Sequence, residues 1–368
     1  MRPMTETELA EAIRDASGPL VVRGGGTRSI GRPVVGEELS VAGLSGISLY
    51  EPGALTLVAA AGTPVAEVEA ALAAQAQRLP FEPMDHRGIL GSDGVPTLGG
   101  MVAANASGPR RMQVGACRDS LIGVRFVDGT GAVVKNGGRV MKNVTGYDLV
   151  KLMAGSWGTL GVLSEVAFKL LPAPDSAATL VLNGLDVSQA VAAMAAALGS
   201  PYDVTGAARL PDGRTALRLE GFAASVAYRL GELTTHLARF GQATYLAPEE
   251  VAEFWRSVRD VAPFQGQDGD VWRLSVKPSD APALVAMAGA DALLDWGGGL
   301  VWLLIKPGTD LRAVLGDFKG HATLIRASID TRSRIAPFHP EPAPVKALTQ
   351  GLRSRFDPRG ILNAGLME

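Results

Sequence analysis

The sequence predicts an α+β fold in two domains. Three observations support this: the 368 residues exceed the size at which one core usually stops growing, the hydrophobic fraction of 47% is typical of a folded protein, and predicted strands and helices alternate in the second half. Pro172-Ala173-Pro174 interrupts the pattern, so we expect a first domain over residues 1–174. A mostly antiparallel second domain is expected over 175–330, followed by a C-terminal segment over 331–368.

The first half begins with a helix and continues mostly as strands. Thr5 and Glu8 form a capping-box pattern ahead of an apolar helical stripe that ends at Gly18-Pro19. Thr63 followed by Pro64 predicts the start of a helix that runs to Ala76. The expected strands are 20–23, 39–41, 47–50, 55–61, 121–127, 132–135 and 161–171. Glycines and prolines are frequent between residues 81 and 115, which predicts loops there.

The second half consists of strands followed by helices. The expected strands are 179–183, 214–220, 271–276, 300–305 and 322–329. The expected helices are one capped by Asp186 and Gln189, then 223–240, 249–259, one between the last two strands, and one in the C-terminal segment. This order favours helices on one face of a largely antiparallel sheet.

Charge balance and cysteine content exclude several kinds of protein. The formal net charge is -2, which argues against nucleic acid as the main partner because binding to the phosphate backbone normally needs a basic face. The single cysteine, Cys117, excludes an internal disulfide and fits a reducing compartment. The N-terminus lacks the apolar stretch of a signal peptide, and no apolar run approaches the roughly 20 residues of a membrane span. These features predict a cytoplasmic protein.

A triple glycine directly follows the first predicted strand, in Val22-Arg23-Gly24-Gly25-Gly26-Thr27. Successive glycines let backbone N–H groups converge on one point, which suits a phosphate. A nicotinamide-type fingerprint is excluded because Ser29 occupies the place of its last glycine, and a Walker loop is excluded because no Gly-Lys-Ser/Thr is present. On its own, the run is equally consistent with a plain structural turn.

Two further segments of small and polar residues accompany this glycine run. Residues 97–110 contain T-L-G-G and N-A-S-G-P-R, and residues 155–161 read G-S-W-G-T-L-G. Their side chains are short, so both segments allow a flat ligand with polar edges to approach the backbone closely.

With the tail Phe356-Asp357-Pro358-Arg359-Gly360-Ile361-Leu362-Asn363-Ala364-Gly365, these segments resemble the FAD-binding domain of the vanillyl-alcohol oxidase/p-cresol methylhydroxylase (PCMH) family. That family carries R-G-G-G-[TH]-[S], T-x-G-G…N-x-S-G-P-R, G-S-x-G-T-L-G and F-D-P-x-G-I-L-N-P-G in this order. Ala364 replaces the last proline here. The resemblance covers roughly residues 18–174 and 354–366, and it implies a two-lobed FAD-binding domain with an α+β cap.

The resemblance implies FAD contacts in the three loops and in the tail. The residues expected to bind the cofactor are Arg23, Gly24, Gly25, Gly26, Thr27, Arg28, Thr97, Gly99, Gly100, Asn105, Ser107, Gly108, Asp119, Gly158, Gly161, Val162 and Asn363. Arg28 stands where the family commonly has serine, which implies a charged phosphate contact in place of a hydroxyl contact. Covalent attachment in the family uses a histidine where Thr27 stands, so FAD is expected to be non-covalent and Cys117 to be an inert thiol.

Within this family, further motifs resemble the smaller FAD-binding subunits of bacterial glycolate oxidases. They are Glu82-Pro83, the block 97–120, the run 138–148, Trp272-Arg273-Leu274-Ser275 and His321-Ala322-Thr323. This resemblance implies a complex in which a sister FAD-binding catalytic subunit and an iron–sulfur subunit pass electrons from glycolate toward membrane quinones. Lys142 and Tyr147 then either meet the flavin or brace its loops.

The sequence lacks the metal site that catalytic 2-hydroxy-acid dehydrogenases of this family typically carry. That site is rich in histidine and includes H-x-G-D-G-N, whereas the four histidines of this chain are widely separated. No metal site is therefore expected, and His86, His236 and His339 are interpreted as ordinary loop or surface residues. With a single cysteine, any iron–sulfur centre must belong to a partner.

Oxidation of a 2-hydroxy acid requires a cation for the carboxylate, a proton acceptor for the hydroxyl, and a hydride acceptor. Arg273 and Arg326 interrupt apolar strands, where a charge is costly unless it is paired or functional, so each is a candidate for the carboxylate or for a structural ion pair. His321 begins a predicted strand and is the candidate base. The side chains expected to form the cap core rather than a substrate platform are Trp255, Trp272, Trp296 and Trp302.

Three functions stay open on the sequence alone. The leading hypothesis is the FAD-binding subunit of a glycolate oxidase/dehydrogenase complex, which oxidises glycolate to glyoxylate and reaches the inner face of the membrane only through its partners. The alternatives are a self-sufficient FAD-dependent D-2-hydroxy-acid dehydrogenase and a non-catalytic assembly subunit.

Overall fold

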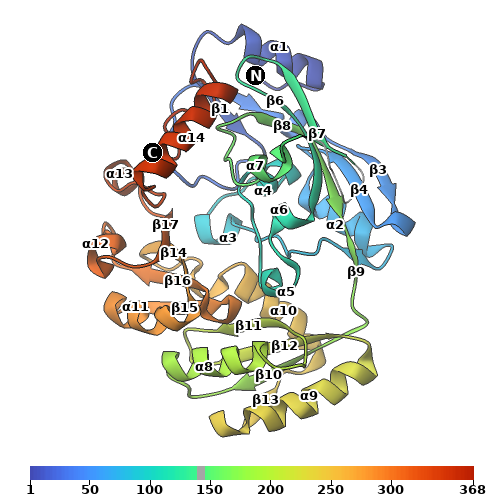
Figure 1. The fold of residues 1–368 in the computed structure, drawn as a ribbon, viewed down its shortest axis with the longest axis vertical. Helices are drawn as coiled ribbons and strands as arrows, with labels where there is room; N and C mark the ends of the chain where they lie inside the picture. Colours follow the sequence, from blue (N-terminus) through green and yellow to red (C-terminus); the bar gives the residue numbers. More distant parts are fainter. Residues whose placement is uncertain (139–145) are drawn as a thin grey trace.

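The computed structural model describes residues 1–138 and 146–368. Two bodies lie along the long axis of the molecule (Figure 1), and both chain ends belong to the upper one. We call the upper body, residues 1–138, 146–172 and 343–368, the N-terminal body. The lower body, residues 176–326, is the cap. The α+β fold with a mostly antiparallel cap is confirmed.

A five-stranded antiparallel sheet forms the centre of the N-terminal body. Its strands in spatial order are β3 (Ile47–Glu51), β4 (Thr56–Ala60), β8 (Val162–Lys169), β6 (Leu121–Val127) and β7 (Val133–Gly137). The alternating pattern of β8 places Val166 and Phe168 in the core beside Leu57 and Phe126. These strands lie where the sequence predicts them.

A small parallel pair of strands, β1 (Leu20–Arg23) and β2 (Glu37–Ser40), lies outside this sheet. The end of the chain joins the free edge of β1: the Leu20 N–H donates to the Ile361 carbonyl at 2.7 Å, and the Asn363 N–H donates to the Leu20 carbonyl at 3.0 Å. The tail motif is therefore brought next to the triple glycine that follows β1.

The helices of the N-terminal body are α1 (Glu6–Asp15), α2 (Val65–Ala73), α3 (Arg87–Leu90), α4 (Leu98–Ala103), α5 (Arg111–Val114), α6 (Cys117–Ser120), α7 (Leu149–Met153) and α14 (Ala343–Phe356). Thr5 caps α1 as predicted, since its hydroxyl accepts the Glu8 N–H at 3.2 Å. The predicted Thr63 cap is wrong. Helix α2 begins after Pro64, and the Thr63 hydroxyl donates to the Ala60 carbonyl at 2.7 Å.

The cap contains an eight-stranded antiparallel sheet, entered just after the short pair β5 (Gln77–Arg78) and β9 (Leu171–Pro172). Its strands in spatial order are β13 (Ala243–Tyr245), β10 (Ser176–Leu182), β12 (Thr215–Gly221), β11 (Val204–Arg209), β15 (Asp291–Asp295), β16 (Leu300–Ile305), β14 (Asp270–Val276) and β17 (Gly320–Arg326).

The two faces of the cap sheet have different partners. One face packs against α8 (Val187–Leu198), α9 (Ala223–Leu237), α11 (Ala281–Ala288) and α12 (Leu311–Leu315). The other face meets α10 (Pro248–Arg259) together with Ile30, Met84 and Ile89 of the N-terminal body. Successive residues alternate between the faces, so Trp272 is in the helix-covered core and Trp302 is in the cluster shared by the two bodies.

The structure adds several elements that the sequence pattern did not predict. Strands β11, β13 and β15 and helix α11 are extra, and the predicted strand 322–329 ends at Arg326, before α13 (Ile329–Arg334). The expected loop 81–115 contains α3, α4 and α5, each only four to six residues long. Helices this short contain less than two turns of hydrophobic periodicity, which is too little to detect.

A buried ionic cluster joins the two bodies. Glu82 of the N-terminal body accepts from both terminal nitrogens of Arg218 on β12 at 2.9 Å, and its Oε1 lies 2.8 Å from Arg110 Nη1. Arg110 also donates through Nε to Glu220 at 2.7 Å. Although burial acts to raise it, Arg110 and Arg218 hold the pKa of Glu220 down at about 2. The carboxylates therefore stay ionised and bind the cap to the N-terminal body.

Across residues 1–138 and 146–368, no helix has the length and apolar composition needed to cross a lipid bilayer.

Candidate cofactor site

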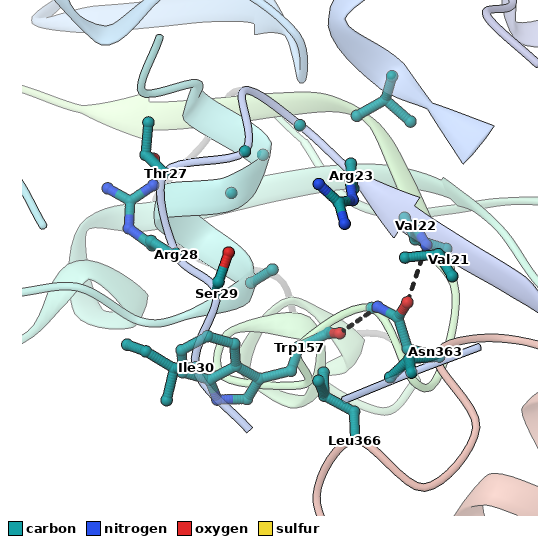
Figure 2. A pocket seen from close by; sticks show the side chains of 18 of the residues that line it. Val21, Val22, Arg23, Thr27, Arg28, Ser29, Ile30, Trp157, Asn363 and Leu366 are labelled. Carbon is teal, nitrogen blue, oxygen red and sulfur yellow. Dashed lines mark hydrogen bonds between the residues drawn. The ribbon is translucent and has the colours of Figure 1, made fainter. Parts of the chain in front are cut away.

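A cavity of about 350 Å³ lies where the loop after β1 meets the start of α4, the 156–163 segment and the end of the chain (Figure 2). The cofactor-site residues predicted from the sequence that line it are Arg23, Gly24, Gly25, Gly26, Thr27, Arg28, Thr97, Gly99, Gly100, Gly158, Gly161, Val162 and Asn363. Helix α13 adds Ile329 and Arg332. Segments that are far apart in the sequence are therefore brought together around one space.

Glycine is required in the loop after β1 for two different reasons. A Cβ atom on Gly24 would lie 2.3 Å from the Thr97 hydroxyl oxygen, and one on Gly25 would lie 1.5 Å from the Val95 carbonyl oxygen, so the loop packs directly on the backbone before α4. Gly26 has no such neighbour but adopts a φ of +72°, which other residues rarely adopt.

The backbone of this loop offers a run of free donors. Among the described residues, the N–H groups of residues 25–29 donate to no protein acceptor. Gly25, Thr27 and Arg28 are buried or half-buried. Amides of such residues normally have a partner, so free ones at a cavity indicate a ligand with acceptor oxygens. A pyrophosphate has that chemistry.

Arg28 supplies a positive charge beside these amides. Its guanidinium is largely buried, its Nε has no hydrogen-bond partner within the described chain, and Nη2 makes one long bond of 3.4 Å to the Met84 carbonyl. Burial lowers the pKa of Arg28 to about 10. An anion at this position would compensate the buried charge. Two independent features of the cavity therefore fit a phosphate group: the free amides and the Arg28 guanidinium.

Asn363 fixes the wall of the cavity opposite the glycine loop. Its side-chain carbonyl accepts the Val22 N–H at 2.8 Å and its Nδ2 donates to the Trp157 carbonyl at 2.9 Å (Figure 2). Asn363 itself has a φ of +45°, which asparagine tolerates better than most residues. A Cβ on Gly158 would lie 3.0 Å from Asn363 Nδ2. Nearby Ser156 Oγ is buried without a partner among the described residues.

Four of the predicted cofactor residues lie behind the cavity wall rather than on it. Asn105 accepts the Arg118 N–H at 3.0 Å and Ser107 Oγ accepts the Cys117 N–H at 2.9 Å. The Gly108 carbonyl accepts from the Trp296 indole at 3.0 Å, and Asp119 accepts the Ala116 N–H at 2.8 Å. In this structure they shape the 104–120 segment that supports α4.

The residues relevant to covalent attachment and metal binding are also placed. Thr27 is buried at the cavity, where covalent relatives are expected to have histidine. Cys117 is fully buried, and burial raises the pKa of its thiol well above the usual value. In the described ranges, no three His, Cys, Asp or Glu side chains gather as a metal site requires. Tyr147 is exposed, and Lys142 lies outside the described residues.

The three candidate catalytic residues are not brought together. Arg326 uses its five N–H groups on the backbone carbonyls of Ile89, Phe264, Gln267 and Gly269, so it fastens a loop. His321 is exposed on the edge strand β17, with its ring 5.5 Å from that of His339. Arg273 on β14 is different, because its guanidinium lies over Trp296 and Trp302 in the cluster shared by the two bodies.

His86 is a residue whose position sequence reasoning missed. It is buried rather than at the surface, and its Nδ1 has no partner among the described residues. Burial, with the charges of Arg28 and Arg273 nearby, lowers the pKa of His86 to about 3, so the imidazole is neutral. Sequence contains no signal for this, since all three residues belong to different segments.

Comparison with known proteins identifies the class. The family model described as "FAD binding domain" matches residues 1–137. A solved structure of alkyldihydroxyacetonephosphate synthase superposes with a TM-score of 0.70 over 99% of this chain and 76% of that chain, at 16% identity. The fold and cavity are those of a PCMH-type FAD-binding protein, and FAD is the cofactor that the free amides and Arg28 fit.

The particular family follows from a full-length relative. The chain is 37% identical to glycolate oxidase subunit GlcE of Escherichia coli over 364 residues, which covers 98% of this chain and 95% of that protein. This chain belongs to that family of FAD-binding proteins. It is also 33% identical over 175 residues to a D-lactate dehydrogenase of Archaeoglobus fulgidus, covering 47% of this chain and 38% of that enzyme.

Proposed function

We propose that this chain is the FAD-binding subunit of a glycolate oxidase complex and takes part in the oxidation of a small 2-hydroxy acid to the 2-oxo acid. The observation that carries the proposal is the row of free amides with the buried Arg28 charge at the cavity after β1. The similarity to GlcE, which spans nearly the whole of both chains, supports glycolate as the first substrate to test.

The residues of this chain would bind and orient FAD. When bound, FAD supplies the two-electron acceptor for the hydride that leaves the carbon bearing the hydroxyl. The amides of residues 25–29 and the Arg28 guanidinium would hold the pyrophosphate, and Thr27 in place of histidine supports non-covalent binding. Gly158 and Asn363 would lie along the opposite wall of the site.

Arg273 is the residue we propose for the substrate carboxylate. Among the described residues its guanidinium has no ion pair or hydrogen bond, whereas every N–H of Arg326 is already used. His321 lies on an exposed sheet edge and has no cavity contact that supports a role as base. An unpaired arginine in the cap favours a substrate site in this subunit itself over a purely assembling role.

The proposed partners are a sister FAD-binding subunit and an iron–sulfur subunit. Iron–sulfur clusters are held by several cysteines, and this chain has only Cys117, which is buried. Electrons that leave the flavin would therefore pass to a cluster on another chain. We place the complex in the cytoplasm, at the inner face of the membrane through those partners.

The decisive experiment is the visible spectrum of the purified chain before and after anaerobic addition of glycolate. A flavin spectrum that bleaches with glycolate alone supports a catalytic subunit. If the chain without partners also turns over glycolate with an artificial electron acceptor, it is the self-sufficient dehydrogenase. A flavin that bleaches only after the sister subunit is added assigns this chain to electron transfer or assembly. A colourless chain that binds no added FAD would overturn the proposal.

A further inference from the structure

Two arginines, one from each body, lie against the same tryptophan. The Arg111 guanidinium, on α5, lies 4.4 Å from the centre of the Trp296 ring, and the Arg273 guanidinium, on β14, lies 5.3 Å from it. Trp296 is held firmly: its indole N–H donates to the Gly108 carbonyl at 3.0 Å and its backbone N–H donates to Asp295 at 2.7 Å. A fixed aromatic ring therefore positions two cations at the contact between the two bodies.

Neither guanidinium has a carboxylate within ion-pair distance among the described residues, although the charge of Asp119 acts on Arg111. Within the described chain neither side chain donates a hydrogen bond or forms an ion pair, although Arg110 and Arg218 close by are fully engaged with Glu82 and Glu220. Burial and the Arg111 charge lower the pKa of Arg273 to about 10, and no carboxylate acts in the opposite direction. Two positive charges against one buried aromatic ring favour an anion.

Arg273 is also linked to the cofactor site through His86. His86, which is buried, is influenced by the charge of Arg28 on one side and of Arg273 on the other. Arg28 lines the cavity after β1, and its Nη2 donates to the Met84 carbonyl, two residues before His86, at 3.4 Å. His86 Nδ1 is free among the described residues, which leaves a polar group for a ligand hydroxyl. The charges of Arg273 and of the cavity residue Arg28 therefore act on the same buried histidine.

We propose that Arg111 and Arg273 together bind one carboxylate, that of the 2-hydroxy acid, across the contact between the N-terminal body and the cap. Planar guanidiniums match a carboxylate through paired hydrogen bonds, and two of them give an anion site that a single arginine does not. The identity of the anion rests on the proposed function, whereas the pairing of Arg111 with Arg273 rests on the contacts with Trp296.

The test measures glycolate binding without turnover. Glycolate is titrated by calorimetry into the FAD-loaded chain after anaerobic reduction of its flavin, because a reduced flavin accepts no further hydride. R111Q and R273Q should each weaken glycolate binding by at least about 10-fold, since hydrogen bonds to charged groups are the strong ones. R118Q is the matched control: Arg118 is exposed near α5, and its loss should change binding less than about twofold.

Further variants and ligands separate a charge effect from misfolding. R111K and R273K keep the charge and lose the planar fork, so they should bind glycolate with intermediate affinity while keeping the wild-type flavin spectrum. Glycolamide, which lacks the carboxylate, should not bind the wild-type chain. Wild-type affinity in R111Q, or no glycolate binding by the wild-type chain, would overturn the proposal.

These outcomes are distinguishable from failure of the proposed function. If glycolate bleaches the oxidised flavin while R111Q binds glycolate normally, the proposed function is supported and the proposed carboxylate site of Arg111 and Arg273 is wrong. If glycolate binding needs both arginines but glycolate never bleaches the flavin, the carboxylate site is supported and catalysis by this chain is ruled out.

Discussion

Arg28 stands in the cofactor site where the resemblance drawn from the sequence implies a serine. The departure is chemically large, because a serine hydroxyl is neutral and Arg28 is a buried cation with an unpartnered Nε. Such a group is unfavourable in the empty protein and favourable when an anion is present. Arg28 thereby links the stability of the chain to occupancy of its cofactor site.

Replacement of Arg28 should therefore have opposite effects on the empty and the loaded protein. Arg28→Met removes a cation whose pKa burial lowers to about 10, so the free energy of unfolding of the FAD-free chain should rise by about 1–3 kcal/mol. FAD affinity, measured by quenching of flavin fluorescence, should fall at least about 10-fold. Arg256→Met is the control, since Arg256 lies outside the cavity, exposed on α10 and paired with Glu253.

Asp295 should make the chain less stable as the solution becomes more alkaline. Burial raises the pKa of Asp295 to about 7, although the Trp296 N–H bond acts against this. The folded state therefore holds a proton that the unfolded state releases near pH 4, so this contribution is fully present below pH 4 and is lost as the pH rises toward 7. In Asp295→Asn the group cannot ionise.

The measurement for Asp295 is urea denaturation at pH 5 and pH 8. Asp295→Asn should be more stable than the wild-type chain at pH 8, by about 1.4 kcal/mol for each unit of pKa shift, and the advantage should shrink at pH 5. The exposed Asp291→Asn serves as the control. Equal stability of wild type and Asp295→Asn at both pH values would contradict the buried, protonated carboxyl.

Among the elements, strand β12 and the loop at Glu82 depend on one another through the ionic cluster. Arg218 on β12 is fully buried, and its two terminal nitrogens both bind Glu82 at 2.9 Å. Removal of one partner leaves the other charge buried and uncompensated, which is more costly than the pair is stabilising. The cluster is thus a point at which a single substitution weakens contact between the two bodies.

Glu82→Gln should lower the free energy of unfolding by about 3–5 kcal/mol. Glu253→Gln is the matched control, because the pair Glu253–Arg256 is exposed on α10 and should contribute no more than about 0.5 kcal/mol. Urea denaturation followed by tryptophan fluorescence measures both. A Glu82→Gln chain as stable as the control would show that the cluster is already compensated by water or by Glu220.

Elements with a clear hydrophobic period were predictable from sequence, and those defined by tertiary contacts were not. The strand 162–169 has Val166 and Phe168 buried and Glu165 and Lys169 partly exposed, as the sequence pattern predicted. Asp186 and Gln189 form the capping box of α8, also as predicted. Strand β11 was missed because its small residues carry no pattern: a Cβ on Gly206 would lie 2.8 Å from the Trp255 ring, so Gly206 is chosen by close packing.

The same distinction explains the candidate site. The role of Gly24, Gly25 and Gly26 was predictable because adjacent glycines after a strand indicate, from the local sequence alone, a backbone that something approaches closely. The contacts of Arg111 and Arg273 with one tryptophan, and the effect of Arg273 on His86, arise only when the cap folds onto the N-terminal body. No spacing in one chain reports such a contact, so these residues required the structure.

At the scale of the whole molecule, the cofactor site is closed by the end of the chain. Asn363 joins Val22 on β1 to Trp157, so residues from three distant parts of the sequence share two hydrogen bonds. The cap is inserted between the 156–163 segment and this tail. Loss of the tail contact should therefore affect FAD more than it affects the cap.

Asn363→Gly and Asn363→Asp test this closure. Glycine accepts the φ of +45° without strain but removes both side-chain bonds, so FAD release should accelerate and the melting temperature of the loaded chain should fall. Aspartate keeps the acceptor for the Val22 N–H and loses only the donor to Trp157, so its effect should be smaller. An aspartate variant that loses more FAD than the glycine variant would contradict the assignment of these two bonds.

Val22 and Asn363 are 341 positions apart in the sequence. This separation also determines when the site is completed during biosynthesis. A ribosome that adds about 5–20 residues per second needs on the order of 20–70 s to make that length. During this time Val22, just before the glycine loop, lacks its hydrogen bond with Asn363. The nascent chain can form its first sheet early, but it cannot close the wall that Asn363 completes. Closure of this wall around FAD therefore follows the synthesis of Asn363.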